Sequence, residues 1–428
     1  MPAAPQFQSD FLRTFAARGA YYDCSAPEDL DALFGKERVT AYIGFDCTAD
    51  SLHVGSLVQL MTLRRLQQAG HRPILLMGGG TTKAGDPSGR DDTRLILTPE
   101  QIEANKQSIL GGIRHLLKFG DGPSDAILVD NADWLDKLDY IPFLRDVGKH
   151  FSVNRMLTME SVKLRMEREQ PLSFLEFNYS IMQAYDFVEL YKRYGCKLQS
   201  SGSDQWGNVV SGIDLGRRME SAQLFGLTTP LITTASGAKM GKTAAGAVWL
   251  NADRVSPYDY WQFWRNTEDR DVGRFLRLFT DMPEDEILRL EKLEGAELND
   301  AKKVLATEAT AILHGRDAAE KSGDTARRAF EEGASAEGLP TITATLPDGI
   351  LNLAVAAGLA ASNSEARKLI ANNGLKLNDA AVSDPKLMVD ASALNSDGVL
   401  KLSSGKKKHV LVKPPRSVGA SRSDQKKT

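Results

Sequence analysis

The sequence predicts an α/β fold whose first and largest part is a parallel, doubly wound sheet. Two observations lead to this prediction. Short apolar runs typical of buried strands alternate with stretches of helical periodicity, and polar or glycine-rich segments directly follow those runs. Charged helical periodicity dominates after about residue 250, and a strand-containing segment ends the chain, so two smaller parts are expected after the sheet.

The elements of the first part are expected in a fixed order. Residues 1–35 predict a helical lead-in, and Val39–Phe45 predicts the first buried strand. A helix over Leu52–Ala69 is closed by Gly70. The elements expected after it are a strand at Pro73–Met77, a helix capped by Thr98, a strand at Ala126–Val129, helices between 171 and 220, and a strand near Lys197–Gln199.

The chain has 428 residues, enough for two or three domains. Changes in composition along the chain set the expected boundaries. We expect a sheet domain at 1–245, an α-helical domain at 246–331, a linker rich in small residues at 332–348, a small α+β domain at 349–413 and a basic tail at 414–428.

The composition is that of a globular protein and excludes a collagen-like or wholly disordered chain, with 42% hydrophobic and 25% charged residues. The 53 basic and 56 acidic residues give a net charge of −3, so any contact with nucleic acid must come from a local basic patch. We find neither a long apolar run nor a secretory signal. The three widely spaced cysteines exclude a disulfide framework and a zinc pair, which indicates a reducing cytoplasm.

The first segment that suggests chemistry runs from Asp46 to Ser56, between a predicted strand and a predicted helix. Ligands bind at this edge of open α/β sheets, and the free N–H groups of a helix start favour phosphate. His53 can donate to phosphate oxygens, and Gly55 lets a flat base approach the backbone. The alternative is a capped helix with a structural histidine.

The second segment is Lys239-Met240-Gly241-Lys242-Thr243. Two lysines among glycines suit a loop that closes over a polyphosphate. It is not a P-loop, because Ser236 stands where that motif needs glycine. The alternative is an ordinary solvated loop.

Together and in this order, the two segments resemble the paired signatures of class I aminoacyl-tRNA synthetases. Four further runs resemble the bacterial tyrosyl-tRNA synthetases: Tyr42–Asp46, Gly85–Gly89, Phe177–Phe187 and Gly202–Asn208. The resemblance extends from about residue 35 to 412. It implies a Rossmann-like catalytic domain, an anticodon-binding helical domain and a small RNA-binding domain.

The resemblance also implies which residues bind tyrosine. Tyr42 and Asp186 correspond to residues that hydrogen-bond the substrate phenol. The substrate ammonium and carboxylate are held by residues corresponding to Asp86, Tyr179, Gln183 and Gln205. Independently of the resemblance, helical spacing puts Tyr179, Gln183 and Asp186 on one face, which suits a pocket wall better than a solvated stripe.

The residues expected to handle ATP follow in the same way. Thr48 and His53 correspond to residues that grip the γ-phosphate, and Lys239, Lys242 and Thr243 to the loop that clamps pyrophosphate. The adenylate is expected against Gly44, Asp46, Gly55, Ser56 and Asp204, with Lys242 also near the nucleotide. Mg²⁺ is expected to arrive bound to ATP, with no metal held by the protein itself.

Two positions depart from the family pattern. Ser56 stands where a second histidine is common, which predicts a weaker or water-bridged contact to ATP. Cys47 stands where proline is usual. Its thiol is either sensitive to oxidation near the nucleotide or, as we favour, buried and inert.

The last domain resembles a small RNA-binding module shared with ribosomal proteins. Its expected phosphate contacts are Arg367, Lys368, Lys376, Lys406, Lys407 and Lys408. Asp379 replaces a common glycine, and its negative charge is expected to weaken RNA contact locally. The tail after Pro415 is either part of the basic patch or a solvated end.

The resemblance implies a tyrosine–tRNA ligase that uses tyrosine, ATP and tRNA(Tyr) and works as a homodimer, away from membranes. Three alternatives stay open: a tryptophanyl-tRNA synthetase, a small-molecule nucleotidyltransferase and a non-catalytic RNA-binding paralogue. The intact His53 and lysine segment disfavour the last, and the run Gly202–Asn208 disfavours the first.

Overall fold

A computed structural model provides the coordinates. It describes residues 5–87, 96–237, 240, 242–243, 246–331, 339–395, 398–405 and 408–415. The chain forms two compact units: Met1–Val255 with Trp264–Gly315, and Ser256–Phe263 with Arg316–Thr428. The finer division that the sequence suggests, with separate helical and linker segments, stays a prediction.

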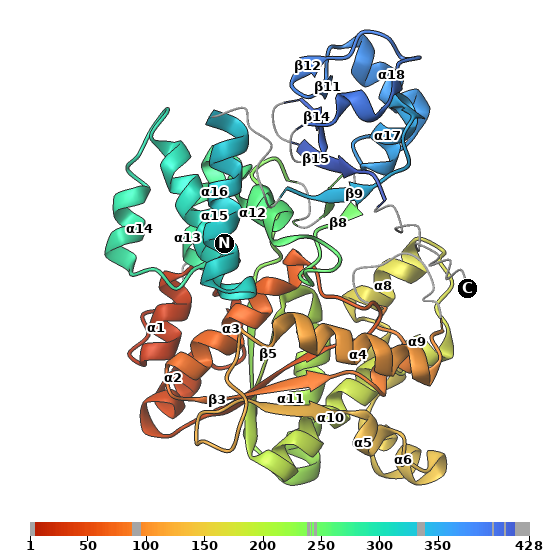
Figure 1. Cartoon of the computed structure of the whole chain (residues 1–428). Coiled ribbons are helices and arrows are strands. Elements are labelled where there is room, and N and C mark those ends of the chain that lie inside the picture. Colours follow the sequence, from red (N-terminus) through yellow and green to blue (C-terminus); the bar gives the residue numbers. More distant parts are fainter. Residues whose placement is uncertain are drawn as a thin grey trace, which may run out of the picture. The chain divides into compact units, whose positions relative to one another are not determined.

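The first unit is built on a six-stranded sheet with the order β1-β6-β5-β2-β3-β4 (Figure 1). Its strands are β1 (Asp23–Cys24), β2 (Thr40–Phe45), β3 (Arg72–Met77), β4 (Ile127–Asp130), β5 (Cys196–Gly202) and β6 (Phe225–Thr229). All neighbours run parallel except β1, which pairs antiparallel with β6 at one edge. The predicted doubly wound α/β class is confirmed.

The four strands expected from apolar runs are β2 to β5, each within a few residues of its predicted bounds. The sequence did not predict β1 and β6. β1 has only two residues and therefore no pattern of its own. β6 includes Gly226, Thr228 and Thr229, whose side chains carry too little apolar character for a clear signal.

Helices cover both faces of the sheet (Figure 1). On one face, Tyr42, Ile74 and Leu76 of the sheet share a core with Phe187 and Leu190 of α10. Helix α11 packs beside α10, and α3 covers β2, β3 and β5 from the other face. The helices around the sheet are α1 (Asp10–Ala17), α2 (Pro27–Lys36), α3 (Leu57–Gln68), α4 (Pro99–Ile113), α10 (Tyr179–Tyr194) and α11 (Trp206–Glu220).

Short helices fill the segment between β4 and α10. They are α5 (Ala132–Leu135), α6 (Tyr140–Asp146), α7 (Val153–Met156), α8 (Glu160–Glu167) and α9 (Phe174–Phe177). Helices α5 to α8 were not predicted from the sequence because helices of four to eight residues show little periodicity. The predicted Thr98 cap of α4 is present and forms a capping box, since the Thr98 hydroxyl accepts from Gln101 N and the Gln101 side chain accepts from Thr98 N.

Three further helices complete the first unit: α13 (Val272–Phe279), α14 (Glu284–Leu290) and α15 (Leu298–His314). Helix α13 buries Phe275 and Phe279, whose rings contact that of Trp264. The buried Arg65 of α3 donates to the carbonyl oxygens of Arg277 and Leu278, both at 2.7 Å. These bonds satisfy the free carbonyl groups at the end of α13 and hold it to α3.

The second unit contains most of α12 (Pro257–Arg265), α16 (Arg316–Glu331) and a five-stranded sheet with the order β12-β11-β14-β15-β9. The strands are β9 (Thr341–Thr343), β11 (Leu375–Leu377), β12 (Ala380–Ala381), β14 (Leu400–Ser404) and β15 (Lys408–Lys413). Helices α17 (Ile350–Ala356) and α18 (Asn363–Ala371) share a buried core with this sheet. β9 lies within the stretch predicted as linker and pairs parallel with β15.

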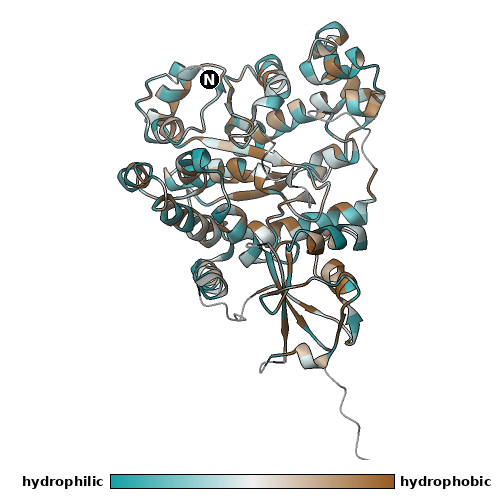
Figure 2. Ribbon diagram, turned by 90° about the horizontal axis from the view of Figure 1, so that it is seen from above, coloured by the Kyte–Doolittle hydropathy of each residue, from teal (hydrophilic) through white to brown (hydrophobic). Residues whose placement is uncertain are grey.

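Side-chain hydropathy follows this architecture. Figure 2 shows brown, hydrophobic stretches within the strands of the sheets, interrupted by paler polar positions, whereas the surrounding helices alternate between brown and teal. No described helix combines the length and the apolar character that a bilayer span requires.

Candidate active site

A cavity of about 420 Å³ opens where β2, β3 and β5 end at their carboxyl side. Parallel sheets of this kind bind their ligands at that edge. The cavity collects predicted residues that lie far apart in the sequence: Tyr42, Gly44, Asp46, Thr48, His53, Gly55, Ser56, Asp86, Tyr179, Gln183, Asp186, Asp204 and Gln205. Tyr179, Gln183 and Asp186 all come from α10 and do line the same wall.

One end of the cavity is a buried polar pair. Asp186 is 1% exposed and accepts hydrogen bonds from Asn131 Nδ2 at 2.9 Å and Trp134 Nε1 at 2.7 Å. Tyr42 is also 1% exposed, and its hydroxyl has no hydrogen-bond partner among the described residues. A buried hydroxyl without a partner is costly, so this end is suited to a ligand that carries a hydroxyl group.

Burial shifts both groups away from their ordinary titration. It raises the pKa of Asp186 to about 8, against the opposing effect of the bonds from Asn131 and Trp134, while Asp46 and Asp130 raise it further. The pKa of the Tyr42 phenol is well above its usual value, first because of burial and then because of the Asp186 charge. Perturbed groups in a cleft are typical of functional sites.

A second polar group occupies the middle of the cavity. Asp86 accepts from Gln205 Nε2 at 2.8 Å, and Asn208 Nδ2 bridges Gln183 at 3.1 Å and Gln205 at 2.9 Å. The Tyr179 hydroxyl donates to Asp46 at 3.1 Å. Carboxylates and amides in this arrangement suit an ammonium group and its neighbouring carboxylate.

The third part is centred on His53. The Gly55 N–H donates to His53 Nδ1 at 2.9 Å, which leaves Nε2 as the protonated nitrogen of the neutral ring. A Cβ on Gly55 would lie 2.6 Å from His53 Cε1. The ring therefore requires glycine at this position, a steric reason that the sequence analysis did not anticipate.

The segment after the lysine loop lies along His53. Val54 N donates to Val248 O and Leu250 N to Leu52 O, so Trp249 pairs with His53 across a short antiparallel bridge. Lys242 and Thr243 form β7 (Lys242–Thr243), which pairs with β8 (Gly246–Ala247). Lys239 lies outside the described residues, and the side chains of Lys242 and Thr243 are not described either.

Several residues of the site were not predicted from the sequence: Thr81, Asn131, Gln199 and Trp249, which line the cavity, and Trp134, which donates to Asp186. Thr81 and Asn131 follow β3 and β4 closely, so polar residues just after a predicted strand were the available signal.

The glycines before Thr81 are required by close packing. A Cβ on Gly78 would lie 2.3 Å from Asp46 Oδ1, and one on Gly79 would lie 2.4 Å from Asp130 Oδ1. Any other residue in this turn would displace the carboxylates that follow β2 and β4.

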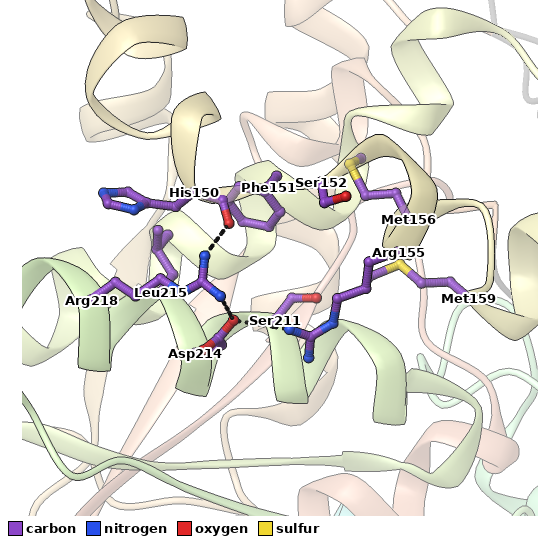
Figure 3. A pocket seen from close by; sticks show the side chains of 10 residues that line it. All are labelled: His150, Phe151, Ser152, Arg155, Met156, Met159, Ser211, Asp214, Leu215 and Arg218. Carbon is purple, nitrogen blue, oxygen red and sulfur yellow. Dashed lines mark hydrogen bonds and ion pairs between the residues drawn. The ribbon is translucent and has the colours of Figure 1, made fainter.

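A second, smaller cavity lies apart from these residues (Figure 3). Asp214 of α11 accepts from Arg155 at 3.0 Å, and Arg218 donates to the carbonyl of His150 at 2.7 Å and pairs with Asp214 at 2.9 Å. The arginines of this cavity are thus engaged with the protein itself.

The predicted RNA contacts fall in the second unit. Arg367 and Lys368 are exposed on α18, Lys408 is exposed at the start of β15, and Lys376 is half-buried in β11. Lys406 and Lys407 lie outside the described residues. Asp379 has φ +68°, which explains why glycine suits the position, and its carboxylate pairs with the buried Lys401 at 2.8 Å.

Two further expectations concern the reactivity of Cys47 and metal binding. All three cysteines are free and buried, and burial raises the pKa of the Cys47 thiol to about 12, which favours the unreactive form. The described residues contain no group of three or more His, Cys, Asp or Glu side chains arranged to hold a metal ion.

Comparisons with known proteins match this architecture. The family model described as tRNA synthetases class I (W and Y) matches residues 35–331, and the tyrosine–tRNA ligase SYY-like C-terminal domain matches 319–412. A curated tyrosine–tRNA ligase from Bradyrhizobium diazoefficiens is 62% identical over 413 residues, which cover 95% of this chain and 99% of that protein. The chain belongs to the tyrosine–tRNA ligase family of class I tRNA synthetases.

Other relatives agree with this membership. The tyrosine–tRNA ligase of Rhodopseudomonas palustris is also 62% identical, over 95% of this chain and 99% of its own. Among solved structures, a C-terminally truncated mitochondrial tyrosyl-tRNA synthetase from Aspergillus nidulans is 30% identical with a TM-score of 0.68, covering 76% of this synthetase chain and 95% of that one.

Proposed function

We infer that this synthetase joins L-tyrosine to tRNA(Tyr) in two steps. A tyrosine carboxylate oxygen attacks the α-phosphorus of ATP, and the bond to the leaving pyrophosphate breaks. A hydroxyl of the terminal tRNA ribose then attacks the carbonyl carbon of tyrosyl-adenylate and releases AMP. Neither step requires a covalent bond to the protein, so catalysis consists of positioning and electrostatic stabilisation.

The observation that carries this proposal is the buried pair at the end of the cavity. The Tyr42 hydroxyl lacks a partner among the described residues, and Asp186 is held rigidly by two donors. A substrate phenol can partner both residues, because its oxygen accepts a hydrogen bond from the Tyr42 hydroxyl and its O–H donates one to the Asp186 carboxylate. Phenylalanine would leave the Tyr42 hydroxyl without a partner and would give Asp186 no donor beyond Asn131 and Trp134, which is a strong basis for rejection.

The roles of the remaining residues follow the cavity from that end. Asp86, Tyr179 and Gln183 hold the ammonium group, and Gln205 lies near the carboxylate. Asp46, Gly44, Ser56 and Asp204 line the adenylate. Thr48 and His53 Nε2 stabilise the charge that develops on the departing pyrophosphate, together with Lys239, Lys242 and Thr243, and Mg²⁺ arrives with ATP.

The proposal extends to partners and location. Arg367, Lys368, Lys376 and Lys408 contact the tRNA backbone, and the enzyme acts in the cytoplasm as a homodimer. The large apolar side chains of Tyr140 and Ile141 on α6 and Val153 on α7 are more than half exposed, which supports association between copies. Light scattering of the purified chain tests the dimer directly.

A tryptophan-specific synthetase is the nearest alternative, since the family model covers both substrates. Indole offers a single N–H donor and no acceptor, so it would leave the Tyr42 O–H without an acceptor. The relatives at 62% identity are likewise tyrosine–tRNA ligases.

Amino-acid-dependent exchange of pyrophosphate into ATP tests the proposal, followed by charging of tRNA(Tyr). We expect exchange with tyrosine, and at least about a thousandfold less with tryptophan or phenylalanine. Preferred exchange with tryptophan, or no exchange with any of the three, would refute the assignment.

A further inference from the structure

Two cavity residues outside the predicted set, Thr81 and Asn131, connect its two ends. Thr81 is 3% exposed at the start of η2 (Thr81–Lys83), and Asn131 is 1% exposed directly after β4. Because β3 and β4 are neighbours in the sheet, their carboxyl ends bring the two side chains together. Asn131 Nδ2 lies 2.9 Å from Thr81 Oγ1.

The direction of each hydrogen bond can be assigned. Asn131 Oδ1 accepts from Gly80 N at 2.8 Å, so its NH₂ group faces the cavity. One amide hydrogen goes to Asp186 Oδ2 and the other to Thr81 Oγ1, both at 2.9 Å. The Thr81 hydroxyl therefore gives its only proton to Asp46 Oδ1, at 2.8 Å.

The two carboxylates at the ends of this chain serve different parts of the cavity. Asp186 lies with Tyr42 at the buried end of the cavity, where the tyrosine ring is expected. Asp46 directly follows β2, where the nucleotide is expected, and accepts a second hydrogen bond from the Tyr179 hydroxyl. Close packing keeps the connection rigid, since a Cβ on Gly78 would lie 2.6 Å from Thr81 Oγ1 and 2.3 Å from Asp46 Oδ1.

We propose that Thr81 is a positioning residue that couples recognition of the tyrosine ring to activation at the nucleotide end. It orients Asp46 through its own proton and fixes Asn131, and thereby Asp186, through its lone pair. The inference rests on the proposed tyrosine–tRNA ligase function. Thr81 itself touches no reacting atom in this scheme.

Thr81→Val tests the proposal because valine keeps the shape and removes the hydroxyl. We expect kcat/KM for tyrosine in pyrophosphate exchange to fall about 10- to 100-fold and the preference for tyrosine over phenylalanine to fall at least about 5-fold. Thr81→Ser keeps the hydroxyl and should stay within about 3-fold of wild type. Equal damage in both variants, or an unchanged preference in Thr81→Val, would overturn the proposal.

Thr62→Val is the matched control. Thr62 is 2% exposed in α3, and its hydroxyl donates to Val58 O at 2.9 Å, away from the cavity. It loses a buried hydroxyl in the same unit, so we expect both kcat/KM and the tyrosine preference to stay within about 2-fold of wild type. A loss of preference as large as that in Thr81→Val would show that general destabilisation accounts for the effect.

A double-mutant cycle keeps the proposal testable if Thr81→Val fails to fold. Trp134→Phe removes a donor to Asp186, and Tyr179→Phe removes a donor to Asp46. The effects of mutations at distant, independent sites on kcat/KM multiply to within about 2-fold. Coupling through Thr81 therefore predicts that kcat/KM of the double variant deviates at least about 5-fold from the product of the two single effects. Multiplicative effects contradict the coupling, whereas a wild type without tyrosine-dependent exchange defeats the proposed function and this inference with it.

Discussion

Asp186 illustrates how burial sets the chemistry of a single residue. Burial raises its pKa from the ordinary 3.8 to about 8, so the carboxyl group is stabilising while protonated and this stability is lost as the pH rises through about 8. Tyrosine binding favours the opposite protonation state, since the ionised carboxylate accepts the hydrogen bond from the phenol more strongly than the neutral acid does. Ionised Asp186 therefore lowers the stability of the fold but favours binding of the tyrosine hydroxyl.

A pH profile follows from this assignment. The kcat/KM for tyrosine in pyrophosphate exchange should rise between pH 6 and 9, with its midpoint near 8, because deprotonation makes Asp186 a stronger acceptor for the phenol O–H. The residual exchange of Asp186→Asn should lack this rise. A wild-type profile that is flat or falls over the same range would contradict the assigned role.

Gly55 provides a second prediction for a single residue. In Gly55→Ala, the new methyl group would meet His53 Cε1 at 2.6 Å and turn the imidazole away from its present orientation. We expect kcat for adenylate formation to fall about 10²-fold or more, with the Kd of tyrosine nearly unchanged. Single-turnover kinetics and equilibrium dialysis measure the two quantities.

The matched control is Gly35→Ala in α2, where a Cβ would meet no atom within 4 Å. This variant should behave as wild type in both measurements. A Gly55→Ala enzyme with normal kcat would show that the orientation of His53 does not matter to activation.

At the scale of elements, the turn between β11 and β12 depends on a buried charge. Lys401 of the neighbouring strand β14 is 3% exposed, and it forms an ion pair with Asp379 in the turn. Asp379→Ala should destabilise the chain by about 1–2 kcal/mol in urea unfolding, less than a fully buried pair because Asp379 is half exposed. Asp324→Ala, which removes an exposed pair with Arg327 in α16, should change stability by less than about 0.5 kcal/mol. Equal effects would contradict the importance of burial.

Elements were predictable from sequence where a local pattern determines them. The apolar runs of β2 and β3 and the Thr98 capping box gave correct elements within a few residues. β1, α5, α6 and α7 are short, and they are stabilised by pairing or packing with distant segments. No local pattern carries that information.

At the scale of the whole molecule, the two compact units divide the proposed work. The cavity belongs to the first unit, whereas Arg367 and Lys368 are exposed in the second. The double variant Arg367→Ala, Lys368→Ala should leave tyrosine-dependent exchange unchanged. Its KM for tRNA should rise about 10-fold, and the salt dependence of tRNA binding should become shallower. A loss of exchange, or unchanged tRNA affinity, would contradict this division.

Many of the residues that line the cavity were predictable from the sequence, but the hydrogen bonds that connect them were not. Motif resemblance identified residues such as Tyr42, His53 and Asp186, which the fold brings into one cavity. Thr81, Asn131 and Trp134 escaped notice because their roles arise from contacts between separate strand ends. Such hydrogen bonds exist only in the folded chain and leave no spacing pattern in the sequence.

The central claim is that Asp186 recognises the tyrosine hydroxyl in the cavity that also contains His53. The most direct measurement is the ratio of kcat/KM for tyrosine to that for phenylalanine in pyrophosphate exchange, in wild type and in Asp186→Ala. We predict that the variant loses tyrosine activation by at least about 10³-fold and that the ratio collapses towards one. Near-normal tyrosine exchange with an intact preference in Asp186→Ala would contradict the account.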